Sequence, residues 1–386
     1  MADFYTVCAF QMARTTRKIK ILYTIPNFDT AGSGKALLKI AERLDPKQFE
    51  PHICCMHDRG AFFQVVQQSG IPVHIFPYTA DMSNRIRGLQ KVWHIARFFK
   101  KLNPDIIHSF HYAPDYSETL ASKLSGIKWV YTKKNMNWGS SSKNGWRLRS
   151  WLADGIIAQN TDMLRDFFSG WRKVTLIPRG VDTNEFGPTA PNLNIRAQLR
   201  LAPAERLIIC VANLVPVKGV EVLLDAFDTI KDTFPDVKLA IVGDDVSEYG
   251  TQLKQQACRM APVRIVFTGK VLNVKDYLHT ADIFVLPTLN KGRQEGSPVS
   301  LLESMACGLP VLASAVAGIR DQLKNFPELL FQPGNSLQLA QKLTSLLSKT
   351  KEERMNLGEQ LRQEVLKRFT IEREVEVHQS FYTQIC

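Results

Sequence analysis

The sequence lacks the features that mark several large classes of protein. It contains no uninterrupted apolar run of the roughly 18 residues that a membrane-spanning helix needs. Asp3 precedes the short N-terminal apolar stretch and the basic residues follow it, which is the wrong order for a secretory signal peptide. The seven cysteines include no CxxC pair, so neither a zinc ribbon nor a disulfide framework is indicated. Because free thiols suit a reducing compartment, we expect a cytoplasmic protein.

Patterns for several kinds of chemistry are also missing. There is no DxD motif, no HxH at metal-ligand spacing and no cluster of Cys and His, so we expect neither a metal nor another cofactor. The GxSxG nucleophile motif is absent as well. No recognised nucleic-acid-binding motif occurs, and we expect no nucleic acid partner, although charge alone would allow one.

Positive charge is abundant but confined to one half of the chain. The 386 residues include 49 Lys and Arg against 37 Asp and Glu. Residues 1–180 hold 26 basic and 13 acidic side chains, whereas residues 181–386 hold 23 and 24. This asymmetry favours an anionic partner for the first half, such as a membrane surface or a phosphorylated substrate. A basic surface without any such partner is the alternative.

Short apolar runs rich in β-branched residues alternate with segments of helical length. Continuous apolar strands of this kind are typical of parallel sheets covered on both faces. The runs lie at 18–25, 51–56, 72–77, 105–110, 128–132, 155–159, 174–178, 206–213, 237–243, 263–268, 283–287, 310–314 and 329–332.

The strand pattern restarts once, after a polar, proline-containing stretch at 182–205. We therefore predict an α/β protein with two Rossmann-like parallel-sheet domains, at 18–180 and 181–365, facing a shared cleft. A C-terminal helix at 366–386 is expected to pack back toward the first domain. Residues 1–17 are expected to be a disordered extension, with Met1 or Met12 as the start.

The strongest constellation for chemistry runs from Glu295 to Glu303. Ser297 is a good N-cap and Pro298 is suited to the first helical position, so a helix is predicted to begin there, after Gly296. The free N–H groups of such a helix attract an anion. A phosphate at the helix N-terminus, sugar hydroxyls on Glu295 and ribose hydroxyls on Glu303 would be chemically consistent. A solvated Glu295 and a salt-bridged Glu303 are the alternative.

Other candidate residues follow predicted strands. Lys218 lies between a buried strand and a helix, where an ammonium group could neutralise a diphosphate, unless it is an ordinary surface lysine. Gly32 and Gly34 follow the first strand, and we interpret them as a loop that lets the backbone approach a ligand. A simple tight turn is the alternative, since neither the P-loop nor the dinucleotide pattern is complete.

Two more candidates follow the fourth and fifth predicted strands. His111 could shuttle a proton at the cleft end of the sheet, although a structural role is an equal alternative. Lys134, with its neighbours Lys133 and Asn135, is expected to face the same cleft.

Two basic stretches carry aromatic residues. In 85–101, five apolar residues follow helical spacing and basic residues lie off that face: Ile86, Leu89, Trp93, Ala96 and Phe99. Residues 143–151 combine Trp146 and Trp151 with three basic residues. Both compositions are typical of helices at a membrane interface. For 85–101, a helix packed on the sheet is an equal alternative.

Several of these segments resemble a known family. The motif NLVPVKG at 213–219, the pair Glu295 and Glu303, MACGLPVLAS at 305–314, and IPRGVDTNEF at 177–186 are similar to the retaining glycosyltransferases of family 4, also called glycosyl transferases group 1. The resemblance covers about residues 18–386. It implies the GT-B fold and metal-independent transfer of a sugar from a nucleotide sugar, with residues 18–180 as the acceptor domain and 181–365 as the donor domain.

The resemblance also implies roles for individual residues. Glu295 and Gly296–Ser297 would contact the donor sugar and phosphate, Glu303 the ribose, and Lys218 the diphosphate. Val271 and Leu272 fall where the nucleobase is usually held, and Gly32 with Gly34 match the glycine-rich loop of the first domain. Lys218, Glu295, Lys134 and His111 are the expected catalytic residues.

Three positions depart from the family pattern. Asn213 occupies a position where Arg is frequent. Arg179 stands where Asn is commoner and is expected to compensate as a donor-binding residue. Lys134 occupies the position of a frequent His, and a protonated Lys cannot be the neutral acceptor that His offers.

The expected acceptor is a glycan or lipid-linked molecule in cell-surface polysaccharide or lipopolysaccharide biosynthesis, reached from an anionic inner membrane surface through the basic first domain. A catalytically silent sugar-nucleotide-binding protein and a sugar-nucleotide 2-epimerase are the alternatives.

Overall fold

The computed structural model describes residues 17–29, 31–137, 143–261, 263–292, 294 and 296–386. Most of the predicted extension at 1–17 therefore lies outside the described residues. Contacts divide the chain into two compact units. The first contains residues up to Thr132, 139–157 and 375–386, and the second contains 133–138 and 158–374.

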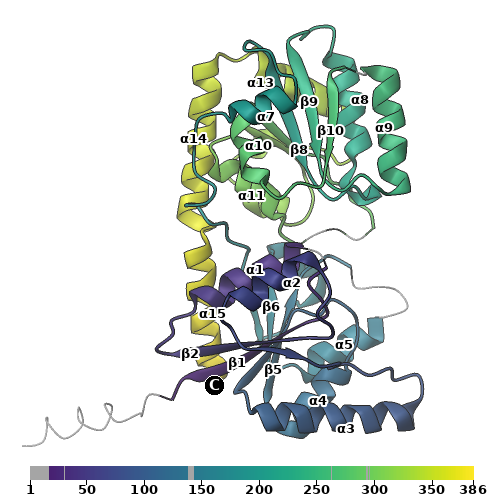
Figure 1. The fold of residues 1–386 in the computed structure, drawn as a ribbon, viewed down its shortest axis with the longest axis vertical. Helices are drawn as coiled ribbons and strands as arrows, with labels where there is room; N and C mark the ends of the chain where they lie inside the picture. The colour runs from purple at the N-terminus through teal and green to yellow at the C-terminus, as the bar shows by residue number, and fades with distance from the viewer. Residues whose placement is uncertain (1–16, 30, 138–142, 262, 293, 295) are drawn as a thin grey trace, which may run out of the picture. The chain divides into compact units, whose positions relative to one another are not determined.

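A seven-stranded sheet carries the first half of the chain, in the order β3-β2-β1-β4-β5-β6-β7 (Figure 1). The pairs β1–β2, β1–β4, β2–β3 and β4–β5 are parallel. The strands are β1 (Ile19–Ile25), β2 (Phe49–Cys55), β3 (Val73–Ile75), β4 (Ile106–Ser109), β5 (Lys128–Lys133), β6 (Gly155–Ala158) and β7 (Val174–Leu176). The helices along it are α1 (Ala31–Arg43), α2 (Ala61–Gln68), α3 (Arg85–Leu102), α4 (Ser117–Ser125), α5 (Lys143–Leu152) and α6 (Thr161–Phe167).

The second sheet has six strands, in the order β10-β9-β8-β11-β12-β13. Its strands are β8 (Arg206–Val211), β9 (Val237–Val242), β10 (Ile265–Gly269), β11 (Ile283–Leu286), β12 (Val311–Ser314) and β13 (Leu330–Phe331). The helices are α7 (Leu193–Gln198), η1 (Pro216–Lys218), α8 (Val220–Ile230), α9 (Glu248–Met260), α10 (Val274–Thr280), α11 (Val299–Ala306), α12 (Ile319–Gln322), η2 (Pro327–Leu329), α13 (Ser336–Ser348) and α14 (Lys351–Arg368).

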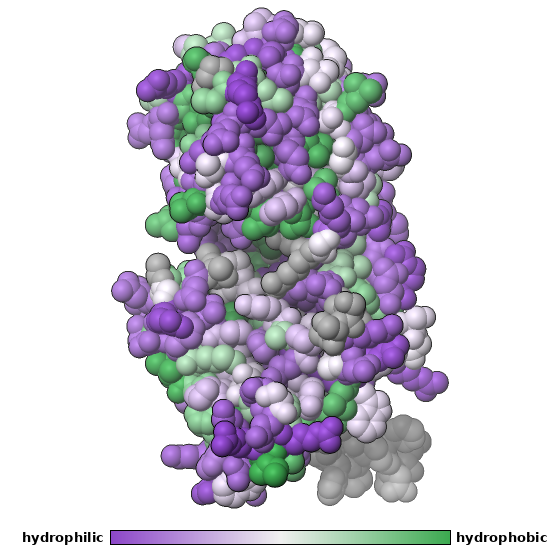
Figure 2. All heavy atoms as spheres, turned by 90° about the vertical axis from the view of Figure 1, so that its right-hand side faces the viewer, coloured by the Kyte–Doolittle hydropathy of each residue, from purple (hydrophilic) through white to green (hydrophobic). Residues whose placement is uncertain are grey.

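Two parallel α/β sheets confirm the predicted fold class, and each predicted apolar run coincides with a strand. The reason is visible in β9, where all six residues are buried because helices cover both faces of the sheet. None of the helices in the described part of the chain is long and apolar enough to cross a membrane. On the face drawn in Figure 2, hydrophilic residues predominate and hydrophobic ones form small separate clusters.

The last helix, α15 (Ile371–Ile385), brings residues 375–386 into the first unit. The Tyr382 hydroxyl lies 3.1 Å from that of Tyr23 and 2.6 Å from Nδ1 of His108. His108 is fully buried and its other ring nitrogen bonds Thr132. This histidine therefore has a structural role in the first unit.

A buried ion network organises the loop after β4. The Arg149 guanidinium lies over the rings of Trp129, Tyr131 and Trp146, at 4.9 to 5.4 Å from their centres. It donates hydrogen bonds to the backbone carbonyls of His111, Ala113 and Asp115.

The carboxylate of Glu118 lies in the same interior, where Thr24 and Ser109 donate hydrogen bonds to it. Burial raises the pKa of Glu118, and the charge of Arg149 opposes that rise. The two charges thus compensate one another inside the core, while the guanidinium fixes the 111–115 backbone.

We expect Arg149→Met to lower the free energy of unfolding by about 3–5 kcal/mol, because Glu118 would remain buried without its compensating cation. Urea titrations followed by tryptophan fluorescence measure this loss. Arg147→Met, on the same helix but exposed, is the control and should be nearly neutral. Equal losses for the two variants would contradict the assignment.

Candidate functional site

The loop before α11 is fixed by backbone hydrogen bonds to a distant segment. The Gly296 N–H donates to the Lys134 carbonyl at 2.9 Å, and the Met136 N–H donates to the Gln294 carbonyl at 3.1 Å. All of these residues belong to the second unit. Glu295, which the sequence places between them, lies outside the described residues.

The Gly296 carbonyl has a partner of its own. The Asn160 side-chain amide donates to it at 2.6 Å, while the Asn160 oxygen accepts from Met163 N–H and so caps α6. Asn160 is fully buried. The N–H and the carbonyl of Gly296 are therefore both hydrogen-bonded, to two segments from the first half of the chain.

Close packing adds a steric constraint at the same place. A side chain on Gly318, which has φ +76°, would meet the Gly296 carbonyl oxygen at 2.1 Å. A side chain on Gly296 would meet the methyl group of Met163 at 2.4 Å and the Lys134 carbonyl at 3.0 Å. Gly318 needs glycine because the backbone passes directly against it, and a side chain on Gly296 would have to displace Met163.

The start of α11 differs from the prediction by one residue. The N-cap is Pro298 and the helix begins at Val299, so the expectation that Ser297 caps it is wrong. The Ser297 hydroxyl instead accepts from Gln322 Nε2 at 3.1 Å, and the same amide reaches the Pro298 carbonyl. These hydrogen bonds hold the backbone just before α11, and the first N–H groups of any α-helix have no partner within the helix. Glu303 lies further along it, half-buried.

Lys218 is the last residue of η1, the next element after β8, and is buried. The Leu289 N–H donates to the Val217 carbonyl, which joins η1 to the segment that follows β11. Gly219 permits this approach, since a side chain there would meet the Pro287 carbonyl at 2.3 Å. Because β8 and β11 are neighbours, Lys218 and residues 296–298 follow adjacent strands at the carboxyl edge of the sheet, the usual ligand site in such folds.

The other donor-site candidates have varied surroundings. Arg179 is buried and its guanidinium pairs with Glu374 at 2.8 Å, while Glu374 also accepts from Gly180 N–H. Asn213 is exposed after β8. Val271 packs against the core, whereas Leu272 is almost fully exposed. Donor binding by each of these four residues stays a prediction. Arg179 would have to bind the donor while its guanidinium is paired with Glu374.

The two lysines at the end of β5 have different surroundings. The Lys133 ammonium is fully buried and donates to Asn135 Oδ1 and to the Asn137 carbonyl. Lys134 is half-buried and its carbonyl receives Gly296 N–H. Lys134 is therefore the one tied to the site loop.

The first unit holds the remaining candidates. Gly32 and Gly34 lie within the first turn of α1, so the expectation of a loop there is wrong. A side chain on Gly34 would meet the Phe28 ring at 2.8 Å, which gives this glycine a packing role, whereas Gly32 faces open space. His111 lies in the loop that Arg149 holds, with its ring next to Tyr78.

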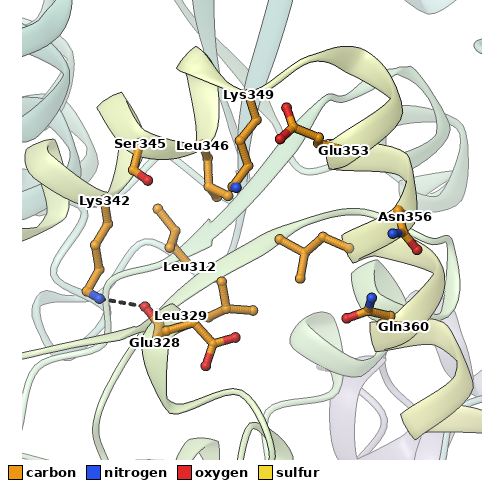
Figure 3. Close-up of a pocket in the computed structure, with 11 residues that line it drawn as sticks. Leu312, Glu328, Leu329, Lys342, Ser345, Leu346, Lys349, Glu353, Asn356 and Gln360 are labelled. Carbon is orange, nitrogen blue, oxygen red and sulfur yellow. Dashed lines mark hydrogen bonds between the residues drawn. The ribbon is translucent and has the colours of Figure 1, made fainter.

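A cavity of about 510 Å³ elsewhere in the second unit contains none of these residues (Figure 3). It lies between η2, α13 and α14, and Lys342 at its edge donates to the Glu328 carbonyl. Among the described residues, no three His, Cys, Asp or Glu are grouped to hold a metal.

Sequence reasoning missed Asn160 and Gln322, which hold the site loop. Asn160 follows a strand and precedes a helix, so its capping role could have been found. Its bond to Gly296 joins residues 136 positions apart, and no local pattern carries that information.

Two family models match the chain. Glycosyltransferase Family 4 matches residues 30–185, and Glycosyl transferases group 1 matches residues 192–364. The chain therefore belongs to the family 4, or group 1, glycosyltransferases with the GT-B fold, which transfer a sugar from a nucleotide sugar.

Individual relatives are distant. The UDP-Gal:alpha-D-GlcNAc-diphosphoundecaprenol alpha-1,3-galactosyltransferase of Escherichia coli is 24% identical over 81% of this chain and 84% of its own length. A glycosyltransferase from Rickettsia africae ESF-5 has a similar structure, with a TM-score of 0.82 and 20% identity over 96% of this chain and 99% of that one. The structure of Anabaena HepE in complex with UDP-glucose is also similar, with a TM-score of 0.76 and 22% identity, and the match covers 95% of this chain and 98% of that one.

We expect Asn160→Ala to raise the dissociation constant for the nucleotide sugar about tenfold. The buried Gly296 carbonyl would lose its partner, a change that costs about 1–3 kcal/mol. Isothermal titration with the donor measures it. Asn192→Ala is a matched control, because half-buried Asn192 also caps a helix but its side chain accepts only from Asn194 and Ile195 N–H, in α7 itself. Weakened binding in both variants would point to a general loss of stability.

Proposed function

We propose that this protein is a retaining hexosyltransferase that works without a metal ion and transfers sugar to a glycan or lipid-linked acceptor. The observation that carries the proposal is the hydrogen bonding that holds Gln294 and Gly296, before α11, while buried Lys218 follows the neighbouring strand. A lysine and a helix N-terminus after adjacent strands suit a diphosphate leaving group. Members of the family use nucleotide sugars, so the donor is proposed to be a nucleotide sugar.

Each candidate has a role in this proposal. Lys218 and the first N–H groups of α11 stabilise the charge that develops on the departing diphosphate. Glu303 binds the ribose hydroxyls, Glu295 and Lys134 orient the sugar, and Gly296 with Ser297 bind the phosphate region. Val271 and Leu272 flank the nucleobase.

The reaction is proposed to occur on one face of the sugar. The bond between the anomeric carbon and the diphosphate oxygen breaks, and the acceptor oxygen forms a new bond to the same carbon from the same side. The acceptor proton moves to the departing phosphate oxygen, so no further base is required. The anomeric configuration is thereby retained.

The acceptor is proposed to bind the first unit. A cavity of about 300 Å³ lies there between residues 80–82 and 113–116. Its second wall is the backbone that Arg149 holds, and His111 lies in the same loop. An acceptor hydroxyl placed there would meet a pre-organised surface. The charge of the first half favours an anionic, lipid-linked or phosphorylated acceptor of cell-surface polysaccharide or lipopolysaccharide biosynthesis.

We expect one class among UDP-, GDP- and ADP-sugars to raise the melting temperature of the protein. At about 100 times its dissociation constant, a ligand adds roughly 2.7 kcal/mol of stability. Glu303→Ala should abolish most of this gain, since the ribose would lose its carboxylate. Glu359→Ala, which removes an exposed carboxylate from α14, is the control and should keep it.

The outcomes separate the alternatives. A shift with one donor followed by transfer to an acceptor supports the proposal. Binding without turnover on any acceptor favours a catalytically silent binding protein, and epimerised donor in the absence of acceptor favours an epimerase. No shift with any sugar nucleotide contradicts the proposed donor site.

A further inference from the structure

The exposed face of α3 is not explained by the fold or by the donor site. Ile86, Leu89 and Trp93 lie at spacings of three and four residues and so share one stripe of the helix. Their exposed fractions are 74, 55 and 52%. We call these three residues the α3 ridge. The sequence had predicted that they share a face with Ala96 and Phe99, but those two are buried.

A different face of α3 packs against the core. The buried residues of α3 are Gly88, Val92, Ile95, Ala96 and Phe99. Figure 1 shows α3 along the margin of the first unit, beside α4. Isolated exposed apolar residues are ordinary, but a second apolar stripe on an amphipathic helix is not needed for folding.

Positive charge accompanies the α3 ridge. The 18 residues of α3 contain no acidic side chain and six exposed basic ones, namely Arg85, Arg87, Lys91, Arg97, Lys100 and Lys101. Within the described residues, none of the six is in an ion pair. The Arg97 guanidinium lies 4.7 Å from the centre of the Trp93 ring, so charge and apolar surface meet directly.

Acidic residues near α3 in the sequence have their hydrogen bonds elsewhere. The pKa of Asp81 is lowered mainly by hydrogen bonds from Ser83 and to a smaller extent by the charge of Lys91. Asp81 accepts hydrogen bonds from the backbone and hydroxyl of Ser83. Asp105 accepts from the Lys20 N–H and from Arg17. Neither carboxylate neutralises the basic residues of α3 through an ion pair in the described part of the chain.

Helix stability does not account for this charge pattern. Lys100 and Lys101 in the last turn interact favourably with the helix dipole. Arg85 and Arg87 are at the other end, in the first turn, where positive charge is unfavourable. The basic residues in the first turn therefore do not serve the stability of the helix.

We propose that the α3 ridge and its basic residues form a surface that docks on an anionic lipid bilayer. The apolar ridge enters the boundary between headgroups and acyl chains, the lysine and arginine side chains reach the lipid phosphates, and Trp93 lies at the interface between them. This surface deepens the proposed function, on which it rests for its purpose, because a lipid-linked acceptor is reached at a membrane.

The test is co-sedimentation of the full chain with vesicles of phosphatidylcholine, alone or with about one third phosphatidylglycerol. The wild type should bind the anionic vesicles, more weakly as salt rises, and should not bind the neutral ones. The triple variant Ile86→Ser, Leu89→Ser, Trp93→Ser should bind at least tenfold more weakly. The triple variant Arg87→Gln, Lys91→Gln, Arg97→Gln should lose about a hundredfold, at roughly fivefold per basic residue.

A matched control is available in the second unit. Leu193→Ser, Val246→Ser, Val263→Ser removes three apolar side chains that are 78, 88 and 77% exposed and should leave vesicle binding unchanged. Absence of wild-type binding to anionic vesicles overturns the proposal. Binding that survives in both α3 variants overturns it as well, and binding lost only in the basic variant excludes insertion of the α3 ridge.

Donor binding by the same variants separates this proposal from the proposed function. The melting-temperature shift with a sugar nucleotide should be equal in the wild type and in both α3 variants, which also shows that they fold. Vesicle binding without any donor shift leaves the docking surface standing while the proposed function fails. A melting-temperature shift with the donor but no vesicle binding supports the proposed function and overturns the docking surface.

Discussion

The proposed donor site depends on how the peptide groups around Gly296 are held. Its N–H and its carbonyl are hydrogen-bonded to Lys134 and Asn160, and its carbonyl packs closely against Gly318. A loop that carries a phosphate or sugar ligand must be ordered before the ligand arrives, because ordering it afterwards would weaken binding. The same contacts set the direction in which α11 starts, and therefore where Glu303 lies. Helix position and loop conformation are thus consequences of a few hydrogen bonds between segments that are distant in the sequence.

The strands were predictable because burial on both faces leaves a continuous apolar signal, as in β9. Local capping was less predictable. Ser297 is an ordinary N-cap candidate, yet its hydroxyl is taken by Gln322, which no spacing rule could connect to it. Gly32 and Gly34 were expected in a loop that lets the backbone approach a ligand, but both lie in α1, where Phe28 leaves no space for a side chain on Gly34. In α3, periodicity gave a single apolar stripe, whereas tertiary packing divided its members between the core and the surface.

The basic residues in the first half of the chain are likewise divided between the interior and the surface. Arg149 and Lys133 are fully buried and Arg179 nearly so, and each has internal partners. These cations order neighbouring parts of the chain and contribute little to the electric field outside the protein. The basic residues of α3 are exposed and without ion pairs in the described residues, so they contribute most where a partner would feel them. Net charge counts both kinds equally, and only the structure separates them.

The place of α15 bears on how the protein is made. Tyr382 completes a buried hydrogen-bond chain with Tyr23 and His108, and Phe381 fills the space beside Gly155. A chain emerging from the ribosome therefore exposes this part of its first unit until residues 375–386 have been synthesised, after the whole second unit. Domains usually fold in the order of synthesis. Here the unit that begins first is finished last, so its open apolar surface persists during translation and is the part of the nascent chain that a chaperone would have to protect.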